Sequence, residues 1–244
     1  MSKRVDLSEE TAVTGTSPGL HGYVARPSTT GPWPGVVMVH EVFGVDDVTR
    51  RQADRLAKAG YLTVVPDLYS AGGAIRCLKA TFGALKARRG RAFQDIEAAR
   101  TWLTTQPDCT GRVGIIGFCM GGGFALVAAT RGFDASSVNY GKLPEEAEVA
   151  LQGACPVVAS YGARDRALKG AAATLESALT WLGVEHDVKE YPTANHSFLN
   201  DATNGPLVLR PLLKIAGIGP DPVAAPDAWA RIEAFFAKHL QTAG

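Results

Sequence analysis

Short apolar runs alternate with amphipathic stretches of helical length through most of this chain of 244 residues. Short apolar runs are typical of buried strands, and apolar residues at helical spacing are typical of helices that pack on a sheet. This alternation predicts an α/β fold, a mostly parallel twisted sheet with helices on both faces. The predicted strands are residues 36–40, 61–66, 112–117, 137–140, 156–161 and 186–191. The predicted helices are residues 48–59, 92–105, 120–131, 171–182 and 227–240.

The composition is that of a globular protein, with 46% hydrophobic and 20% charged residues. The 25 Lys and Arg residues nearly balance the 24 Asp and Glu residues, so the net charge of +1 gives no electrostatic case for binding nucleic acid or an anionic membrane. A short basic run at residues 86–91 is interpreted as a solvated helix end. Because no repeat or linker interrupts the pattern, we predict a single domain over residues 1–244, with residues 203–226 forming a loop or lid over the pocket.

The first ten residues contain no apolar segment of the kind found in secretory signals, and no stretch reaches the ~20 apolar residues that cross a bilayer. The four cysteines form no Cys-x-x-Cys pair, which argues against a disulfide framework or a zinc site. They are Cys77, Cys109, Cys119 and Cys155. We therefore predict a cytoplasmic protein without metal or cofactor, a monomer or small homo-oligomer whose partner is a small molecule.

The most specific local pattern is Gly117-Phe118-Cys119-Met120-Gly121, which follows an apolar strand and opens a helix. It has the form of a nucleophile elbow with cysteine in place of serine, in which glycines two residues away let the chains approach. The helix N-terminus favours a thiolate, and the Met120 N–H is placed as an oxyanion donor. The alternative is a buried structural cysteine in a glycine-rich turn. No Gly-Lys-Ser/Thr sequence is present for a phosphate loop.

A cysteine nucleophile needs a base and a group that orients the base. Asp165 follows the strand at 156–161, and His196 follows the strand at 186–191, so both lie at the carboxyl ends of strands. The order nucleophile, acid, histidine is that of the elbow fold. The alternatives fit less well: His21 lies in an early edge strand, His186 opens a strand, His239 is on the last helix, Asp187 is inside a strand and Asp201 is too close to His196 in the same loop.

Glu41 follows the strand at 36–40, on the side where Cys119 is expected. Two interpretations compete for it. It is either a loop carboxylate paired with Arg50 or Arg51, or a carboxylate beside the thiol that can take its proton. The same loop supplies the second oxyanion donor in this fold, which here is the Val42 N–H.

These motifs together resemble the dienelactone hydrolase family, the carboxymethylenebutenolidases of the α/β-hydrolase fold. The resemblance runs in order from about residue 20 to 200 and again over the last helix. The cysteine elbow and the His40-Glu-x-Phe-Gly44 motif are specific to the family. The supporting motifs are Pro66-Asp-Leu-Tyr69, Gly162-x-x-Asp165 and His196-Ser-Phe198.

The resemblance implies a triad of Cys119, His196 and Asp165, with Glu41 interacting with the thiol. It also implies hydrolysis of an unsaturated lactone to an open-chain acid, without cofactor or metal. One position departs from the family pattern, because Asn200 stands where the family has an arginine that helps to hold the substrate carboxylate. Arg76 lies in the region that supplies the other substrate arginine of the family.

The sequence thus predicts a hydrolase that cleaves an ester or lactone through a Cys-His-Asp triad and an acyl-thioester intermediate. The loss of the arginine at position 200 favours neutral substrates. Two alternatives remain open at this point. One is a thioesterase or other small-ester hydrolase that uses the same triad, and the other is a non-catalytic binding or redox-sensing protein on a hydrolase scaffold.

Overall fold

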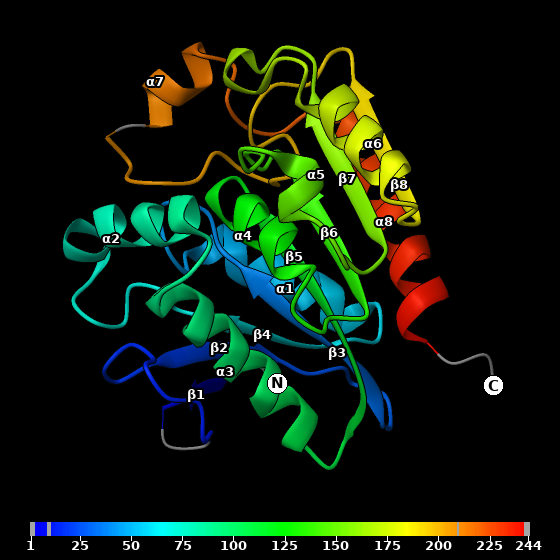
Figure 1. Ribbon diagram of the computed structural model, residues 1–244. Helices are drawn as coiled ribbons and strands as arrows, with labels where there is room; N and C mark the ends of the chain where they lie inside the picture. Colours follow the sequence, from blue (N-terminus) through cyan, green and yellow to red (C-terminus); the bar gives the residue numbers. More distant parts are fainter. Residues whose placement is uncertain (1–2, 9–10, 209, 242–244) are drawn as a thin grey trace.

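The computed structural model describes residues 3–8, 11–208 and 210–241. Within these residues lies an eight-stranded sheet in the order β1-β2-β4-β3-β5-β6-β7-β8 (Figure 1). β2 runs antiparallel to β1 and β4, and the other neighbours are parallel. The strands are β1 (Lys3–Asp6), β2 (His21–Ala25), β3 (Trp33–Val39), β4 (Leu62–Pro66), β5 (Cys109–Phe118), β6 (Ala135–Asn139), β7 (Val157–Gly162) and β8 (His186–Tyr191).

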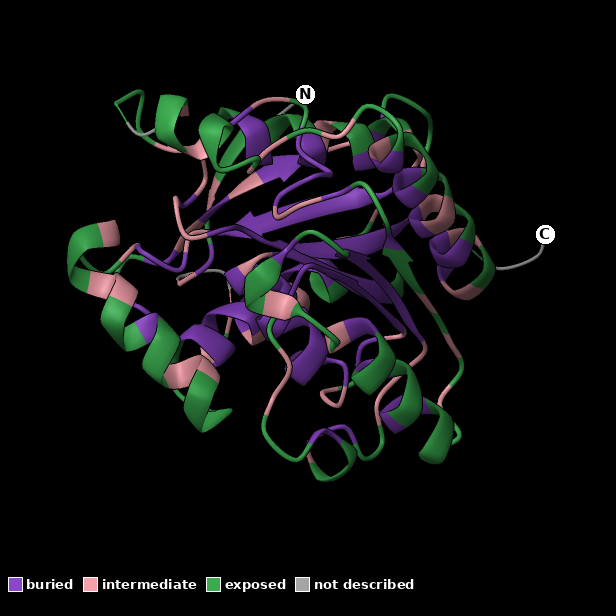
Figure 2. Cartoon of the chain, turned by 90° about the horizontal axis from the view of Figure 1, so that it is seen from above, coloured by how far each residue is buried: buried purple, intermediate pink, exposed green. Residues whose placement is uncertain are grey.

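Helices cover both faces of this sheet, which confirms the predicted α/β-hydrolase architecture. Helices α1 and α8 pack on one face, and helices α3 and α4 pack on the other. The helices are α1 (Asp47–Lys58), α2 (Ala74–Ala87), α3 (Arg91–Thr105), α4 (Met120–Ala128), α5 (Ala147–Ala150), α6 (Ala171–Trp181), α7 (Arg210–Ile215) and α8 (Ala224–Leu240). Figure 2 shows the buried strands between the two helical layers, whose outer surfaces are exposed.

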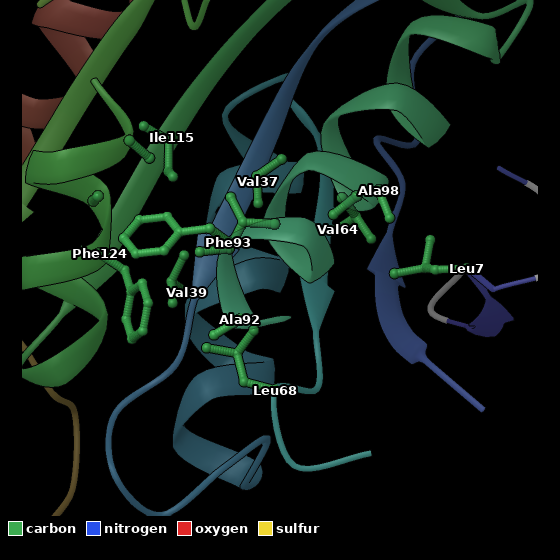
Figure 3. Close-up of a cluster of buried hydrophobic side chains, with 14 of the residues drawn as sticks. Leu7, Val37, Val39, Val64, Leu68, Ala92, Phe93, Ala98, Ile115 and Phe124 are labelled. Atoms are coloured by element: carbon green, nitrogen blue, oxygen red, sulfur yellow. The ribbon is translucent and has the colours of Figure 1, made fainter. Parts of the chain in front are cut away.

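The core follows from the two-residue period of the strands. In β3, Val37 and Val39 face α3 and α4, where they pack with Phe93 and Phe124 (Figure 3). The intervening residues of the same strand face α1 and α8. A central strand buried on both sides is therefore a continuous apolar run, which is why β3 and β5 could be recognised in the sequence.

Strands β3, β5, β7 and β8 are parallel, so their carboxyl ends lie at one edge of the sheet. In an open α/β sheet, ligands bind beyond this edge. The loops and turns after these four strands contain every candidate residue of the sequence analysis except Arg76, which lies on α2. The topology therefore brings together groups that lie up to 155 positions apart in the chain, from Glu41 to His196.

Several predicted boundaries and elements were wrong. β2 is not an edge strand, because β1 pairs along its outer side. Helices α2 and α7 and strand β1 were not predicted, and α4 ends at Ala128 instead of residue 131. Helix α8 begins at Ala224 rather than residue 227, because the Asp221 side chain accepts hydrogen bonds from the N–H groups of Val223 and Ala224, both at 2.9 Å. The expected loop at 203–226 thus contains α7 and the start of α8.

A buried carboxyl group lies on α3, away from the sheet edge. Asp95 is fully buried, and Ser17 donates to it from its backbone N–H (2.6 Å) and its hydroxyl (2.7 Å). Burial raises the pKa of Asp95 to about 6, although the hydrogen bonds from Ser17 act in the opposite direction. The folded state therefore binds a proton on Asp95 more tightly than an unfolded chain does.

We expect Asp95→Asn to remove a pH dependence of stability. Between the unfolded pKa near 4 and the folded pKa of about 6, the wild type binds a proton only when folded, so its free energy of unfolding falls as the pH rises. The loss approaches about 3 kcal/mol by neutral pH. The measurement is urea unfolding of both proteins from pH 4 to 7. The prediction would be contradicted if the difference in free energy of unfolding between the wild type and Asp95→Asn stayed constant from pH 4 to 7.

Candidate active site

Cys119 lies on a strained turn between β5 and α4. Its φ of 55° and ψ of −117° place a non-glycine residue in a sparsely populated region of backbone space, which costs on the order of 1–3 kcal/mol. A Cβ on Gly117 would lie 1.9 Å from the Gly121 carbonyl oxygen, and a Cβ on Gly121 would lie 2.1 Å from the Val39 carbonyl oxygen. The two glycines of the Gly-x-Cys-x-Gly pattern are thus required by backbone contacts, and they hold the half-buried Cys119 at the N-terminus of α4.

Two backbone N–H groups beside this turn have no hydrogen-bond acceptor among the described residues. One belongs to Met120, the first residue of α4, and the other belongs to Val42 in the loop after β3. Free N–H groups at a helix start are suited to bind a negatively charged oxygen. Val42 itself is half-buried.

Asp165 and His196 are directly hydrogen-bonded. Asp165 Oδ2 lies 2.5 Å from His196 Nδ1, and Asp165 Oδ1 accepts from the Ala167 N–H at 3.1 Å. The aspartate is buried, whereas the imidazole remains 22% exposed. Because Nδ1 is engaged by Asp165, Nε2 is the ring nitrogen left for another partner.

Cys119 lies close enough to His196 to affect its pKa. Burial would lower the pKa of His196, but the interactions with Asp165 and Cys119 outweigh it and raise this pKa to about 10. The Tyr140 ring packs against the imidazole with ring centroids 5.1 Å apart. The structure therefore joins Asp165 to His196 by a hydrogen bond and places Cys119 near the same imidazole.

Glu41 is buried beside this chain, and its hydrogen bonds differ from both interpretations of the sequence. Ser197 Oγ (3.1 Å) and Asn200 Nδ2 (3.4 Å) donate to Oε1, and Asn204 Nδ2 (2.5 Å) donates to Oε2. Burial raises the pKa of Glu41, opposed by the Asn204 hydrogen bond and by the nearby His196. Among the described residues, no hydrogen bond joins Glu41 to Cys119.

The first of the two interpretations, in which Glu41 pairs with Arg50 or Arg51, was wrong. Arg51 forms a two-pronged ion pair with Asp201, whose oxygens accept at 2.5 Å and 2.7 Å, and Arg50 lies 3.5 Å from Asp47. Asp201 is thereby directed away from His196. Both arginines thus have other carboxylate partners. The side chains that donate hydrogen bonds to the buried Glu41 carboxyl group are uncharged.

The structure does not bring Arg76 to the other candidate residues. Arg76 is exposed on α2 and lines a cavity of about 650 Å³ with Ser17 and Asp95, and neither Cys119 nor His196 lines that cavity. Its role in substrate binding remains a prediction. The interpretation of His239 as a surface residue was wrong, because its side chain is only 13% exposed and lies 3.3 Å from Glu185.

The partners of Glu41 were missed by the sequence analysis. Ser197, Asn200 and Asn204 are polar residues one, four and eight positions after His196, and all three are buried. Buried polar side chains normally have hydrogen-bond partners. A cluster of amide residues directly after a candidate histidine was the available signal, but the sequence alone does not say that they face Glu41.

Asn200 does not occupy the open position that an arginine would need to bind a substrate carboxylate. It is 2% exposed, and Gln52 Nε2 donates to its Oδ1 at 2.8 Å. An arginine in this place would be forced against Glu41.

The described residues contain no group of three or more His, Cys, Asp or Glu side chains arranged to hold a metal ion. None of their helices is both long enough and apolar enough to span a bilayer.

Comparison with known proteins identifies the family. The model of the dienelactone hydrolase family matches residues 20–240. The chain belongs to the dienelactone hydrolase family. As a member, it is an ester or lactone hydrolase of the carboxymethylenebutenolidase type. The carboxymethylenebutenolidase of Rhodococcus opacus is 29% identical over 89% of this chain and 86% of its own length.

Solved structures agree with the family in fold. A dienelactone hydrolase-like promiscuous phosphotriesterase from metagenomic libraries superimposes on this hydrolase with a TM-score of 0.77 over 98% of both chains, at 24% identity. The dienelactone hydrolase of Anabaena variabilis gives a TM-score of 0.66 over 98% of this chain and 99% of its own, at 22% identity. The predicted family membership and fold of this chain are thus confirmed.

Proposed function

We propose that this protein hydrolyses a small ester or lactone with Cys119 as nucleophile, His196 as base and Asp165 as the group that orients the base. The observation that supports the proposal is the hydrogen bond between Asp165 Oδ2 and His196 Nδ1 at 2.5 Å, beside a Cys119 that is near enough to affect the pKa of His196. A nucleophile, a base and an orienting acid in this order of contact are the requirements of covalent acyl transfer.

In the first half-reaction, the Cys119 sulfur forms a bond to the substrate carbonyl carbon, and the carbonyl electrons move to its oxygen. The free N–H groups of Met120 and Val42 stabilise this oxyanion. When the tetrahedral intermediate collapses, the ester C–O bond breaks and the leaving oxygen takes the proton held on His196 Nε2. The acyl group remains on sulfur as a thioester.

In the second half-reaction, His196 Nε2 removes a proton from water, and the resulting hydroxide attacks the thioester carbon. The C–S bond breaks, the carboxylic acid leaves, and the thiolate–imidazolium pair is restored. Asp165 keeps Nδ1 protonated throughout, which fixes the tautomer that each step requires.

The proposal predicts an acyl-enzyme. We expect rapid mixing with p-nitrophenyl acetate, followed by acid quench and mass spectrometry, to show one acetyl group on Cys119. The acid stops deacylation because it protonates His196, the group that must activate water. The control is the Cys77→Ala variant, which should trap the same adduct. Acetyl groups spread over several nucleophiles, or confined to another residue, would contradict the proposed intermediate.

A further inference from the structure

Two segments hold most of the large hydrophobic side chains that remain exposed to solvent. Six of the nine such side chains among the described residues lie on α2 or in residues 207–215. They are Ile75, Phe82, Leu207, Val208, Leu212 and Ile215, of which Ile75 is 98% and Ile215 is 85% exposed. Single exposed apolar residues are common on proteins, but a concentration of them marks a surface that meets an apolar partner.

Helix α2 carries these residues on its outer side. Leu78 and Leu85 pack against the core beneath the helix. The outer side has a stripe of exposed residues at the spacing i, i+4, i+7 and i+11, which places them on one face of a helix. They are Ile75, Lys79, Phe82 and Lys86. Apolar and cationic side chains therefore alternate along the outer face of α2.

Both segments contain only positive charge. Residues 68–94 include six Lys and Arg residues, residues 202–220 include two, and neither range contains Asp or Glu. These eight cations are about a third of the 25 Lys and Arg residues, whereas all 24 Asp and Glu residues lie elsewhere in the chain. The net charge of +1 therefore conceals a separation of charge along the chain.

The lysines of the two segments are available to a partner. Among the described residues, none of Lys79, Lys86 and Lys214 forms an ion pair. Elsewhere, Lys189 pairs with Asp227 at 2.7 Å. The absence of acidic residues around the three lysines in the sequence explains why they have no such partner.

Both segments lie on one side of the molecule and are attached to the loop after β3. Figures 1 and 2 place α2 and α7 on the same side, opposite α8. A Cβ on Gly205 would lie 2.8 Å from the Phe43 ring, and Arg210 Nε donates to the Gly205 carbonyl oxygen at 2.9 Å. Tyr69, which precedes α2, donates from its hydroxyl to the Val42 carbonyl oxygen at 3.0 Å. The two segments can therefore meet one extended partner.

The chemistry of this side favours an anionic lipid layer. Nucleic acid would match the cations, but its phosphate backbone offers no apolar surface to Ile75, Leu212 or Ile215. In a two-fold dimer the same patch of each copy meets the other, which would place like charges opposite one another. A layer of anionic lipids presents negative headgroups above an apolar interior, and cationic surfaces with exposed Leu, Ile and Phe bind such layers.

We propose that the outer face of α2 and residues 207–215 together bind the surface of an anionic phospholipid layer. The exposed apolar side chains enter the headgroup region, and the lysines contact lipid phosphates. The binding is peripheral, and it does not depend on which residue is the nucleophile.

The test is co-sedimentation of the full chain with vesicles of phosphatidylcholine alone or with about 30% phosphatidylglycerol, since anionic headgroups attract Lys and Arg. Each Lys or Arg near such a surface contributes about fivefold in affinity. We expect binding to the anionic vesicles to be at least about 25-fold tighter than to the neutral ones. It should weaken as salt is raised toward about 1 M, where charges are screened within about 3 Å.

Two double variants separate the charged and apolar contributions. Lys79→Gln/Lys86→Gln removes two cations and should weaken binding about 25-fold. Leu212→Ser/Ile215→Ser removes apolar contact and should weaken binding at least about tenfold. All four side chains are exposed, so both variants should fold, which circular dichroism checks.

The matched control is Trp181→Ser/Lys58→Gln. It also removes a large exposed hydrophobic side chain and an exposed lysine, but from α6 and α1, outside the two segments. This variant should bind the anionic vesicles as the wild type does. Cys119→Ala should do the same, so a failure of the proposed function would leave the vesicle result unchanged.

Several results would overturn the inference. They are equal sedimentation with both kinds of vesicle, unchanged binding in either double variant, or an equal loss in the control. A concentration-dependent dimer in light scattering that Leu212→Ser/Ile215→Ser abolishes would assign this side to a second copy of the chain instead. Tighter binding to a DNA duplex than to the anionic vesicles would assign it to nucleic acid.

Discussion

Replacing Cys119 by alanine should reduce hydrolysis of p-nitrophenyl acetate by more than about 10⁴-fold without unfolding the protein. Removal of the sulfur leaves His196 and Asp165 without a nucleophile, and the half-buried site tolerates the smaller side chain. The measurement is kcat/KM, with circular dichroism as the check on folding. Activity within tenfold of the wild type would exclude Cys119 as the nucleophile.

The same residue should be the fastest of the four cysteines to react with iodoacetamide, and hydrolysis should disappear as it is labelled. Burial raises the pKa of Cys155 to about 12 and raises the pKa of Cys109 as well, so both thiols are poorly ionised near neutral pH. Cys119→Ser should be weakly active, because a hydroxyl needs a stronger base than a thiol does. Equal labelling of all four cysteines would contradict the assignment.

Asp165→Asn should lower kcat by about 10³–10⁴-fold with little change in KM. The amide introduced at position 165 is a weaker acceptor for the Nδ1 proton than a carboxylate is. Its N–H group can also face Nδ1 as a donor, which disfavours the proton on Nδ1 and so destabilises the imidazolium of the proposed resting state. The pKa of His196 should also fall, since Asp165 is one of the groups that raise it. The measurement is the pH profile of kcat in both proteins.

Asp201→Asn provides the matched control, because Asp201 is the other aspartate near His196 in the sequence. Its partner is Arg51, in an ion pair whose side chains are about half exposed, and such pairs contribute at most about 1 kcal/mol. We expect wild-type kcat in this variant. The reverse result, with Asp201→Asn inactive and Asp165→Asn active, would show that the acid has been wrongly assigned.

The central part of the fold could be predicted because its signals are local. A strand buried on both faces is an unbroken apolar run, and the Cys119 turn has glycines where a Cβ would meet the backbone. The elements that were missed have weak local signals. In α2 only Thr81 is buried and no side chain caps the first turn, and three of the four residues of β1 are exposed.

The candidate site also contains residues that could be placed from the sequence and residues that could not. Cys119, Asp165 and His196 could be placed because each directly follows a recognisable strand, and the order of parallel strands is strongly constrained. The partners of Glu41 could not, because Ser197, Asn200 and Asn204 lie 156 to 163 positions away from it in the chain. Local pattern indicates that these residues are buried, but only the packed structure indicates which groups they meet.

The order of the strands also determines when the thiol can become reactive. Cys119 directly follows β5. Asp165 and His196 follow β7 and β8, which are the last two strands to leave the ribosome. Since domains are synthesised from the N-terminus, a growing chain carries this cysteine for about 77 residues before its base exists. Until His196 has been synthesised, Cys119 lacks its proposed base. If Cys119 and His196 act as proposed, acylation by an ester would report that β8, the last strand in the chain, has joined the sheet.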